Sequence, residues 1–424
     1  MAKSDRASTV PATKSQNTRV RRQAPEPIDR KENRRTLAPP PPPKVWHVVG
    51  GVDPILAAAV IALIAFGIVM VYSASSVWAH LRLKNDHALS IRQAIHAAFG
   101  VGLMYVLSRV DYHRLRVFTY PILLITLALL GATAFGFGHE AGGAARWIQL
   151  GPLRVQPAEA AKLAVILWLA YSLSKKTAHI RTFSVGFLPH VVGAGVVMAL
   201  CLKQPDFGSA VMIGLILFLM LFTAGAPLGF LLGAGVISLP IVYYLVTRSE
   251  YRWHRILAYL AKSENYQLHE SWLSFGAGGT TGVGIGDSHQ KLLFLPEAHT
   301  DFISAIIGEE LGLLGFAAMV FVFLLVVYRG VLAAFRAADE YGTYLAVGIS
   351  LFIGSQAFTN LAVAVGLFPT KGLVLPFISY GGSSLLVNCC CVGILLNVSR
   401  ARSSTSTQAT ERASAPARAI GGVA

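Results

Sequence analysis

Besides Lys291, five ionisable side chains gather in 290–315 (QKLLFLPEAHTDFISAIIGEELGLLG), where a polar stretch runs into an apolar one. Each charge placed deep in a membrane costs a few kcal/mol. Chains keep such groups where they have a partner or a chemical task, so this boundary is the first candidate site. Its ionisable members are Glu297, His299, Asp301, Glu309 and Glu310.

Asp301 has the chemistry of a general base, because a carboxylate at the water–lipid boundary can accept a proton from a reacting group. The plainer interpretation is a helix N-cap. Pro296 breaks regular structure, and Thr300 or Asp301 would then cap a helix that runs from Phe302 onward. The helix dipole would tend to keep the aspartate ionised there.

Glu309 and Glu310 lie about two turns further along this expected helix. Buried carboxylates need partners, such as Lys162 or a hydroxyl group. Lys162 closes the motif VQPAEAAK (155–162), in which Glu159 stands three residues earlier and can pair with it on one helix face. The plain interpretation of that motif is a structural ion pair between helices.

Two more polar motifs interrupt the apolar runs. KQPDFGSA (203–210), which contains Asp206, marks a tight turn, and its plain interpretation is a polar hairpin between two helices. In FPTKGLVLPFISYGGSS (368–384) the prolines and glycines indicate a shaped loop, and the glycine pair 381–382 permits close helix approach. Lys371 is the one charge in this loop; it is either a functional cation or a lone lysine that reaches the membrane surface.

The glycine-rich stretch FGAGGTTGVGIG (275–286) offers backbone N–H groups that could meet a phosphate. No strand–helix unit surrounds it, so a dinucleotide-binding fold is not indicated. Cations that could serve an anion lie in the same expected loop and in the loop before the fourth helix. They are Arg252, Arg255, Lys262 and Lys291, with Arg146 and Arg154 from the earlier loop.

Composition indicates a membrane protein. Of 424 residues, 54% are hydrophobic and 13% are charged, whereas soluble globular domains have about 25% charged residues. The net charge of +15 comes from Lys and Arg in a tail and in short loops, which indicates membrane orientation more than nucleic-acid binding. The cysteines, at 201 and 389–391, lie in apolar runs and are interpreted as small buried hydrophobes.

About ten apolar runs are long enough to span a membrane, so we expect an all-α polytopic protein. Lys and Arg cluster in loops 109–116, 175–181 and 329–336, and by the positive-inside rule these loops and both termini are cytoplasmic. A large outer loop, 248–302, then separates the seventh and eighth helices. The expected helices are 52–74, 92–108, 117–137, 157–174, 184–202, 207–225, 228–247, 303–328, 342–366 and 375–398.

Residues 1–44 are polar and Arg-rich and end in a proline run, which predicts a disordered cytoplasmic tail and not a secretory signal. Residues 45–400 form the expected membrane domain, and 401–424 form a second cytoplasmic tail. Apart from groups in mid-span, the polar motifs map to the outer face. From the residues alone, such a site could process a lipid-anchored anion or belong to a transporter.

The motifs taken together resemble the SEDS family (shape, elongation, division, sporulation) of bacterial peptidoglycan glycosyltransferases. LPEAHTDF with the following GEELG, QPAE with Lys162, QPDFG, and PTKG with ISYGGSS occur in the family's order over about 50–400. Ala298 and Lys371 make the chain most similar to the division type within the family, with the sporulation type as the alternative. Ser304 departs from the family pattern, which usually has an aromatic residue there.

The resemblance implies an enzyme that polymerises lipid II, an undecaprenyl-pyrophosphate-linked disaccharide-pentapeptide. Glycan strands would form at the outer face of the cytoplasmic (inner) membrane, at the division septum. The GlcNAc 4-hydroxyl of lipid II would attack the anomeric carbon of the lipid-linked MurNAc, so that undecaprenyl pyrophosphate leaves and the configuration inverts. Asp301 matches the family's proposed catalytic aspartate.

The resemblance also implies a set of binding and supporting residues. No cofactor is certain; a divalent cation, Mg²⁺ or Mn²⁺, is an alternative to protein cations at the pyrophosphate, although no self-contained metal cage is visible. The expected pyrophosphate-binding residues are Lys371, Arg252, Arg255 and Arg146, and the expected supporting residues are Glu159, Lys162, Gln204, Asp206, His299, Glu309, Glu310, Ser379 and Ser383.

The implied partners are a cognate class B penicillin-binding protein and other division proteins, with no nucleic acid. Two alternatives remain open: a lipid II flippase or other transporter, and a non-catalytic scaffold for division proteins. A transporter predicts discontinuous helices and ionisable groups near the membrane midplane, often in repeated halves.

Overall fold

The computed structural model describes residues 46–48, 50–141, 144–150, 153–260, 266–400 and 402–404, within the unit Trp46–Ala424. The expected tails, 1–44 and most of 401–424, lie outside the described residues, and so does Lys262. The assignment of both tails to the cytoplasm therefore stays a prediction.

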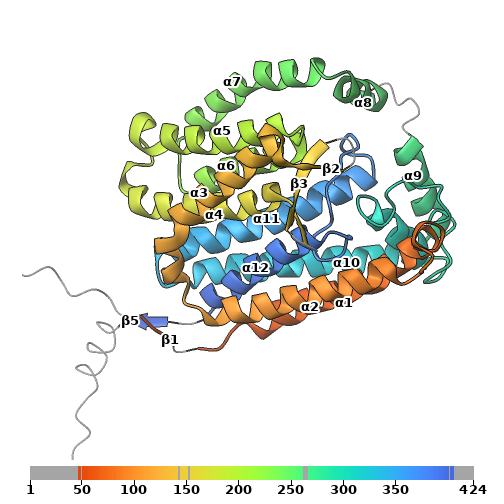
Figure 1. The fold of residues 1–424 in the computed structure, drawn as a ribbon. Helices are drawn as coiled ribbons and strands as arrows, with labels where there is room; N and C mark the ends of the chain where they lie inside the picture. The colour runs from red at the N-terminus through yellow and green to blue at the C-terminus, as the bar shows by residue number, and fades with distance from the viewer. Residues whose placement is uncertain are drawn as a thin grey trace, which may run out of the picture. The chain divides into compact units, whose positions relative to one another are not determined.

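Each of the ten expected apolar runs coincides with a long helix, as Figure 1 shows. The first begins where Asp53 accepts the backbone N–H groups of Ile55 and Leu56, an N-cap followed by a proline in the first turn. The ten helices are α1 (Pro54–Leu83), α2 (Ala88–Arg109), α3 (Leu115–Ala132), α4 (Pro157–Lys176), α5 (Leu188–Lys203), α6 (Phe207–Thr223), α7 (Leu228–Thr247), α10 (Ile303–Phe335), α11 (Glu340–Ala364) and α12 (Gly382–Val398).

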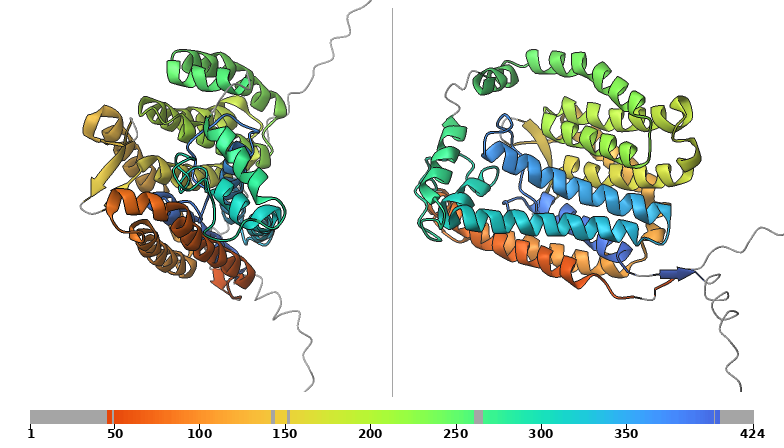
Figure 2. Two further views of the ribbon diagram at one scale, coloured as in Figure 1. Left: turned by 90° about the vertical axis from the view of Figure 1, so that its right-hand side faces the viewer. Right: turned by 180° about the vertical axis from the view of Figure 1, so that it is seen from behind.

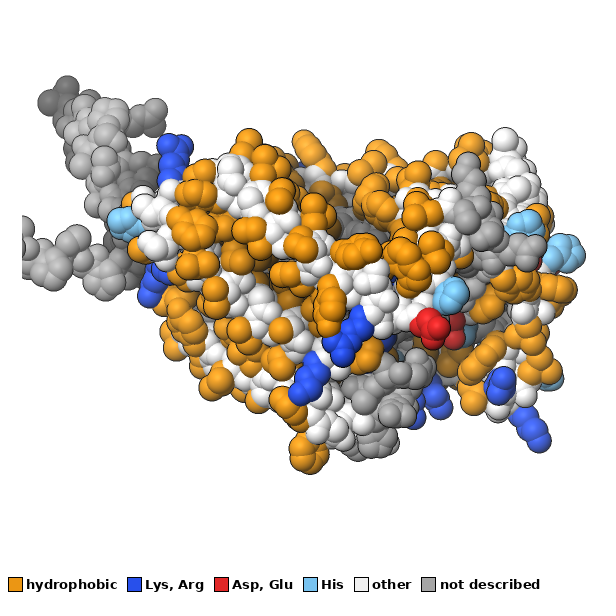
Figure 3. Space-filling model, turned by 90° about the horizontal axis from the view of Figure 1, so that it is seen from above, with side chains coloured by type: hydrophobic (Ala, Val, Ile, Leu, Met, Phe, Trp, Pro, Cys, Tyr) orange, Lys and Arg blue, Asp and Glu red, His pale blue; other side chains and the backbone are white. Residues whose placement is uncertain are grey.

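Within the described part of the chain, six helical segments are long and apolar enough to cross a membrane by length and composition. α6 and α12 are apolar but have 17 residues each, fewer than the roughly 20 that a bilayer core requires. Figure 3 shows hydrophobic side chains over much of one face, with several charged and histidine side chains toward its right-hand end. The chain is therefore a polytopic membrane protein, and the number of ten spans stays a prediction. The six segments are Pro54–Leu83, Tyr112–Phe137, Phe183–Lys203, Leu228–Thr247, Ile303–Phe335 and Glu340–Ala364.

The helices alternate in direction, so their connections gather at two ends. One end, here called the site end, holds the end of α1, the starts of α4, α6, α10 and α12, and the segment 248–302; it lies at the right in Figure 1. At the opposite end Arg329 pairs with Asp53 at 2.6 Å and the Tyr112 hydroxyl donates to Asp339 at 2.7 Å. The Lys- and Arg-rich loops lie at this opposite end, so the site end is the outer face if charge sets the orientation.

Two segments at the site end carry structure that hydrophobic periodicity did not predict. The long segment 248–302 contains two further helices, and 139–155 folds into a three-stranded antiparallel sheet in which Ile148 is opposite Val155. These elements are α8 (Glu250–Leu260), α9 (Tyr266–Gly278), β2 (His139–Ala141), β3 (Ala144–Leu150) and β4 (Leu153–Val155); β1 (Trp46–Val48) pairs with β5 (Arg402–Ser404). Short helical turns are η1 (Tyr112–Arg114), η2 (Thr133–Phe137), η3 (Thr177–His179) and η4 (Phe183–Phe187).

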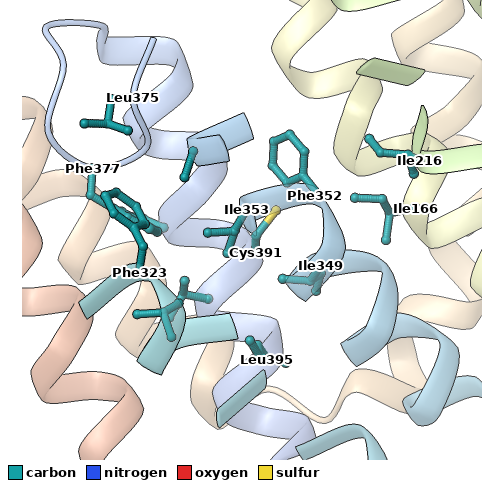
Figure 4. Packing of buried hydrophobic residues seen from close by; sticks show 14 of the residues in the cluster. Ile166, Ile216, Phe323, Ile349, Phe352, Ile353, Leu375, Phe377, Cys391 and Leu395 are labelled. Atoms are coloured by element: carbon teal, nitrogen blue, oxygen red, sulfur yellow. The ribbon is translucent and has the colours of Figure 1, made fainter. Parts of the chain in front are cut away.

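The core lies where α4, α6, α10, α11 and α12 meet, and Figure 4 shows Ile166, Phe352 and Cys391 among its packed side chains. Seen from behind in Figure 2, α10 lies beside both α1 and α11. The expected close helix approach is confirmed at Gly382, where a β-carbon would lie 2.6 Å from Nε2 of His96 on α2. Gly381 precedes the helix instead and is its N-cap residue.

Helix α10 is interrupted at Gly312, which has a φ of +64°, a backbone conformation that favours glycine. The glycine-rich segment after α9 fits against this interruption. Val283 N–H donates to Glu309 O at 3.0 Å, and Leu313 N–H donates to Gly279 O at 2.9 Å. Several N–H groups expected to be free for a phosphate therefore bond to the protein backbone, and that expectation is wrong for them.

Candidate active site

Asp301 lies in a turn that leads into α10. The carbonyl of Glu297 accepts the N–H groups of Thr300 and Asp301, both at 3.1 Å, and also that of Phe302. The N-cap residue of α10 is Phe302, and no side chain caps the helix. The interpretation of Thr300 or Asp301 as a helix cap is therefore wrong. The carboxyl group of Asp301 does not cap α10.

A second loop passes directly over this carboxyl group. A β-carbon on Gly372 would lie 2.9 Å from Oδ2 of Asp301, so only a residue without a side chain leaves the carboxyl in place. Nδ2 of the buried Asn360 donates to the carbonyls of Asp301, at 2.9 Å, and Leu373, at 2.5 Å. One amide on α11 thus fixes the spacing between the Asp301 turn and the loop 365–381.

Further along, the same two segments are joined by Ser379. Its hydroxyl donates to the Thr300 carbonyl at 2.6 Å and accepts the Leu375 N–H at 2.8 Å. The Tyr380 N–H donates to the His299 carbonyl at 3.0 Å. Ser379, expected as a supporting residue, therefore joins the backbone of the Asp301 turn to that of the loop 365–381.

The surroundings of Asp301 favour its protonated form. Burial and, to a smaller extent, the nearby charge of Glu297 raise the pKa of the carboxyl to about 7, while the charge of Arg255 opposes the change. The helix dipole was expected to keep this carboxylate ionised, and removal from water outweighs that effect. A carboxyl with a pKa near neutrality is suited to accept and release a proton at physiological pH.

Lys371 turns toward the start of α6. Its Nζ lies 5.2 Å from the centre of the Phe207 ring, and a β-carbon on Gly208 would lie 3.0 Å from its Cε. Burial lowers the pKa of Lys371 to about 8, while Asp206 opposes that change. Asp206 itself caps α6 by accepting the N–H of Ser209 at 3.1 Å.

The three expected arginines lie around the same place. The guanidinium of Arg252 is 5.4 Å from the centre of the Phe207 ring, on which Lys371 also lies. Arg255 donates to the Thr370 carbonyl at 3.1 Å. Arg146, from β3, donates to the carbonyls of Gln204 at 3.4 Å and Pro205 at 2.6 Å. Four cations from three segments, namely β3, α8 and the loop that holds Lys371, are thus brought to 204–208 and 370–371, as an anion-binding site would require.

Several expected supporting residues bond to other parts of the protein and so hold its segments in place. Lys162 is fully buried and pairs with Glu159 at 2.7 Å within α4, so the expected ion pair is confirmed within one helix and not between two. Gln204 donates to the Leu130 carbonyl at 2.8 Å, and the hydroxyl of Ser383 donates to the Arg154 carbonyl at 3.0 Å. These groups hold the segments beside the site in position.

Glu309 and Glu310 have partners other than Lys162. Glu309 accepts the Ser288 hydroxyl at 2.5 Å and the His289 N–H at 2.9 Å. Glu310 accepts the Ser73 hydroxyl at 2.5 Å and lies 3.7 Å from Nζ of Lys291. The expected hydroxyl partners are confirmed, and Lys162 as a partner is wrong; both carboxylates hold the segment that follows α9.

His299 lies on the other side of the turn from Gly372. Its ring centre is 5.4 Å from that of Trp78 on α1 and 6.0 Å from that of Tyr380. Burial lowers the pKa of His299, so the ring is neutral at pH 7. His299 therefore contributes shape and packing beside Asp301 but no positive charge.

The described residues contain no self-contained metal cage. No group of three or more His, Cys, Asp and Glu side chains among them could hold a metal ion by itself. Mg²⁺ is often bound by one or two carboxylates together with substrate phosphates, so a divalent cation at the pyrophosphate stays a prediction. The cations of Lys371, Arg252 and Arg255 lie around Phe207 and Thr370.

Two residues of the site were not singled out from sequence, and a third, Gly372, was interpreted only as part of a shaped loop. Asn360 is a polar side chain in an otherwise apolar helix, and that contrast was a usable signal. Phe207 belongs to the QPDFG motif but carries no ionisable group, and Gly372 follows Lys371 with nothing in the sequence to show that it covers a carboxyl group. Their roles depend on which segments the fold brings together.

Known proteins with these features are peptidoglycan-synthesis proteins. The cell cycle protein family of FtsW, RodA and SpoVE matches residues 54–404. The "probable peptidoglycan glycosyltransferase FtsW" of Geobacter sulfurreducens is 47% identical over 353 residues, which cover 82% of this chain and 95% of that one. The stage V sporulation protein E of Bacillus subtilis is 39% identical over 357 residues, which cover 82% of this chain and 97% of the other.

Solved structures show the same fold. A structure that concerns "coordination of polymerization and crosslinking by a peptidoglycan synthase complex" has a TM-score of 0.70 and 28% identity, and covers 82% of this chain and 98% of its own. The rod shape determining protein RodA of Thermus thermophilus has a TM-score of 0.62 and 28% identity, with 82% and 97% covered. The chain belongs to the cell cycle protein family of FtsW, RodA and SpoVE.

Proposed function

We propose that the chain is a peptidoglycan glycosyltransferase that polymerises lipid II into glycan strands. The observation that carries the proposal is the position of Asp301 under Gly372, the residue after Lys371, and within the electrostatic influence of Arg255, in a chain that belongs to a family with members named peptidoglycan glycosyltransferase. A sugar hydroxyl is a weak nucleophile and needs an aligned base, and its leaving group needs its charge neutralised. The site offers both groups within one pair of loops.

In the proposed reaction Asp301 accepts the proton of the GlcNAc 4-hydroxyl of lipid II. The oxygen forms a bond to the anomeric carbon of a lipid-linked MurNAc as the bond from that carbon to the pyrophosphate oxygen breaks. Undecaprenyl pyrophosphate leaves with the electron pair, and the configuration inverts. The pKa of Asp301, about 7, lets the carboxylate take the proton and return it to water between turnovers.

The cations near Phe207 are the proposed pyrophosphate site. Lys371 and Arg252 lie on the Phe207 ring, and Arg255 and Arg146 hold the backbone on either side of it. Pyrophosphate already leaves as a stable anion, so the reaction needs neutralised charge more than a general acid. Guanidinium groups suit phosphate oxygens because they can donate two parallel hydrogen bonds.

The partner and the location belong to the same proposal. A similar solved structure concerns a peptidoglycan synthase complex that coordinates polymerization with crosslinking. We infer a cognate class B penicillin-binding protein as the crosslinking partner of this chain. The chain then acts at the outer face of the cytoplasmic membrane, at the division septum; its similarity to proteins named FtsW supports this location.

One feature favours the alternative of a transporter, namely the interruption of α10 at Gly312, because broken helices are common in transporters. Here the interruption is filled by protein backbone, since Leu313 and Leu314 donate to the carbonyls of Gly279 and Thr280. The ionisable groups beside it, Glu309 and Glu310, are bonded to hydroxyl groups. The interruption is thus explained as a packing site for the segment after α9.

The test is polymerisation of purified lipid II by the full chain in detergent, together with its cognate penicillin-binding protein. Glycan strands are expected from the pair and not from the penicillin-binding protein alone. In a parallel measurement the chain is placed in liposomes with lipid II in one leaflet. Movement of lipid II across the membrane without any strands from a folded complex would overturn the proposed function in favour of a transporter.

A further inference from the structure

A second cavity adjoins the turn that carries Asp301. It has a volume of about 410 Å³, within the range of roughly 300–1,000 Å³ found for small-molecule sites. Its walls are the last turns of α1 and the segment 291–299. The residues used below are Trp78, Arg82, Leu293, Glu297 and His299, all of which line it.

One wall of the cavity is a single face of α1. Ala74, Trp78, Leu81 and Arg82 follow the spacing of one helix face. Trp78 presents an indole ring, and sugar rings stack on such rings through their apolar faces. Arg82 is exposed and forms no ion pair with any residue that the structure describes, so its guanidinium is available for a phosphate.

The other wall has a strained backbone. Leu293 and Glu297 have φ values of +74° and +56°, a left-handed backbone conformation that is unfavourable for residues other than glycine. Such strain is concentrated at sites where the surrounding structure must hold a loop in one shape. Glu297 also provides the carbonyl that forms the Asp301 turn, so the wall of the cavity and the position of the proposed base are set by the same residue.

The proposed reaction joins two lipid-linked molecules, each with its own pyrophosphate. The four cations around Phe207 serve the one that leaves. The molecule that supplies the hydroxyl keeps its pyrophosphate, which lies a disaccharide away from the proton that Asp301 takes. It therefore needs a separate anion site on the same face, and Arg82 belongs to elements that contribute nothing to the first site.

We propose that this cavity binds the second lipid-linked saccharide, with its sugar on Trp78 and its pyrophosphate at Arg82. The inference rests on the proposed function, because it assigns a place to the substrate that provides the attacking hydroxyl. His299, the neutral ring two residues before Asp301, lies between the cavity and the reacting groups. The saccharide of the occupant thus lies beside His299, on the side of the cavity nearest to Asp301 in the chain.

The test counts bound molecules by native mass spectrometry of the full chain in detergent. The probe is a lipid II analogue with hydrogen in place of the GlcNAc 4-hydroxyl, which cannot react even if Asp301 is active. Two molecules are expected on the wild type, and one on Arg82→Gln and on Trp78→Ala. Arg92→Gln is the matched control, since Arg92 is exposed at the start of α2 and does not line the cavity; it is expected to bind two.

Two results would overturn the inference: two analogue molecules on both cavity variants, or displacement of the second molecule by excess phosphatidylglycerol, which would make the cavity a site for anionic phospholipid. A kinetic measurement separates this inference from the proposed function. Arg82→Gln is expected to raise the lipid II concentration at half-maximal rate about tenfold with the maximal rate nearly unchanged. An unchanged value in an active enzyme contradicts the cavity assignment alone, whereas an inactive wild type contradicts the proposed function and, with it, the inference.

Discussion

Oδ2 of Asp301 lies 2.9 Å from the point that a β-carbon on Gly372 would occupy. The two residues are far apart in the sequence and meet because Asn360 and Ser379 bond to the backbone of both loops. The backbone of Gly372 therefore limits the positions that the carboxyl group of Asp301 can take when a hydroxyl group approaches it. This relationship makes several predictions that mutations can test.

Gly372→Ala is expected to displace the carboxyl group of Asp301, because the new methyl group would be too close to Oδ2. A shift of about 1 Å at a reacting group can cost on the order of 100-fold in rate, and we expect a loss of at least tenfold in lipid II polymerisation. Gly276→Ala is the control, since a β-carbon there has no atom within 4 Å. Equal rates for the two folded variants would show that Gly372 does not position the base.

Polymerisation is expected to have a bell-shaped dependence on pH. Below pH 7 Asp301, with a pKa of about 7, is protonated and cannot accept a proton; above pH 8 Lys371, with a pKa of about 8, loses its charge. The pH dependence of kcat/KM reports these groups in the free enzyme. The rate should rise through about pH 7 and fall above about pH 8.

Lys371→Arg tests whether Lys371 causes the fall in the polymerisation rate above about pH 8. A guanidinium group keeps its charge throughout the measured range, so the limb near pH 8 should disappear while the limb near pH 7 remains. Lys203→Arg is the control, because Lys203 is exposed and lies 3.5 Å from the Phe135 ring, away from Phe207. A falling limb that persists in Lys371→Arg contradicts the role of Lys371.

Asn360→Ala removes the donor shared by the Asp301 and Leu373 carbonyls. A buried acceptor left without a donor lowers the free energy of unfolding by about 1–3 kcal/mol. The thermal midpoint of unfolding should therefore fall. Polymerisation should fall further than stability explains, because the two loops lose their common anchor. Thr359→Ala is the neighbouring control, since its hydroxyl bonds within α11 to the Ser355 carbonyl; a similar loss of activity there would contradict the specific role of Asn360.

Glu309→Gln tests whether this buried carboxylate is structural. Glu309 accepts from both the Ser288 hydroxyl and the His289 N–H, and an amide oxygen replaces only one charged acceptor. Hydrogen bonds to charged groups contribute roughly 1.5–3 kcal/mol, so the unfolding temperature should drop while some activity remains. Glu340→Gln, at an exposed position of the opposite end, should change neither property. Complete loss of activity in a stable Glu309→Gln protein would indicate a role in the chemistry.

Much of the fold could be predicted from sequence because membrane helices have long apolar runs that are easy to recognise. The runs at 157–174 and 207–225 begin within two residues of the observed α4 and α6. What could not be predicted is structure that depends on contact between distant segments. α8 and α9 are short, and the strands at 139–155 contain too few residues for a clear alternation.

For the candidate site, the residues could be predicted from sequence, but their arrangement could not. Asp301, Lys371 and the arginines could be selected because charges at a membrane boundary are unusual. Their mutual arrangement could not, since it depends on the bonds of Asn360 and on the position of Phe207. The same limit explains why Lys162 was a wrong partner for the glutamates: the actual partners, Ser73 and Ser288, are neutral and have no signal in the sequence.

The account depends above all on Asp301 as the base. The direct test is the rate of lipid II polymerisation by the purified complex with wild type, Asp301→Asn and Asp301→Ala, each checked for folding by its thermal midpoint. Asparagine preserves the shape of the side chain but cannot accept the proton, so we predict that both variants form no glycan strands while lipid II still binds. Strand formation by Asp301→Asn at a rate close to that of the wild type would contradict the account, because the carboxylate would then not be the group that removes the proton.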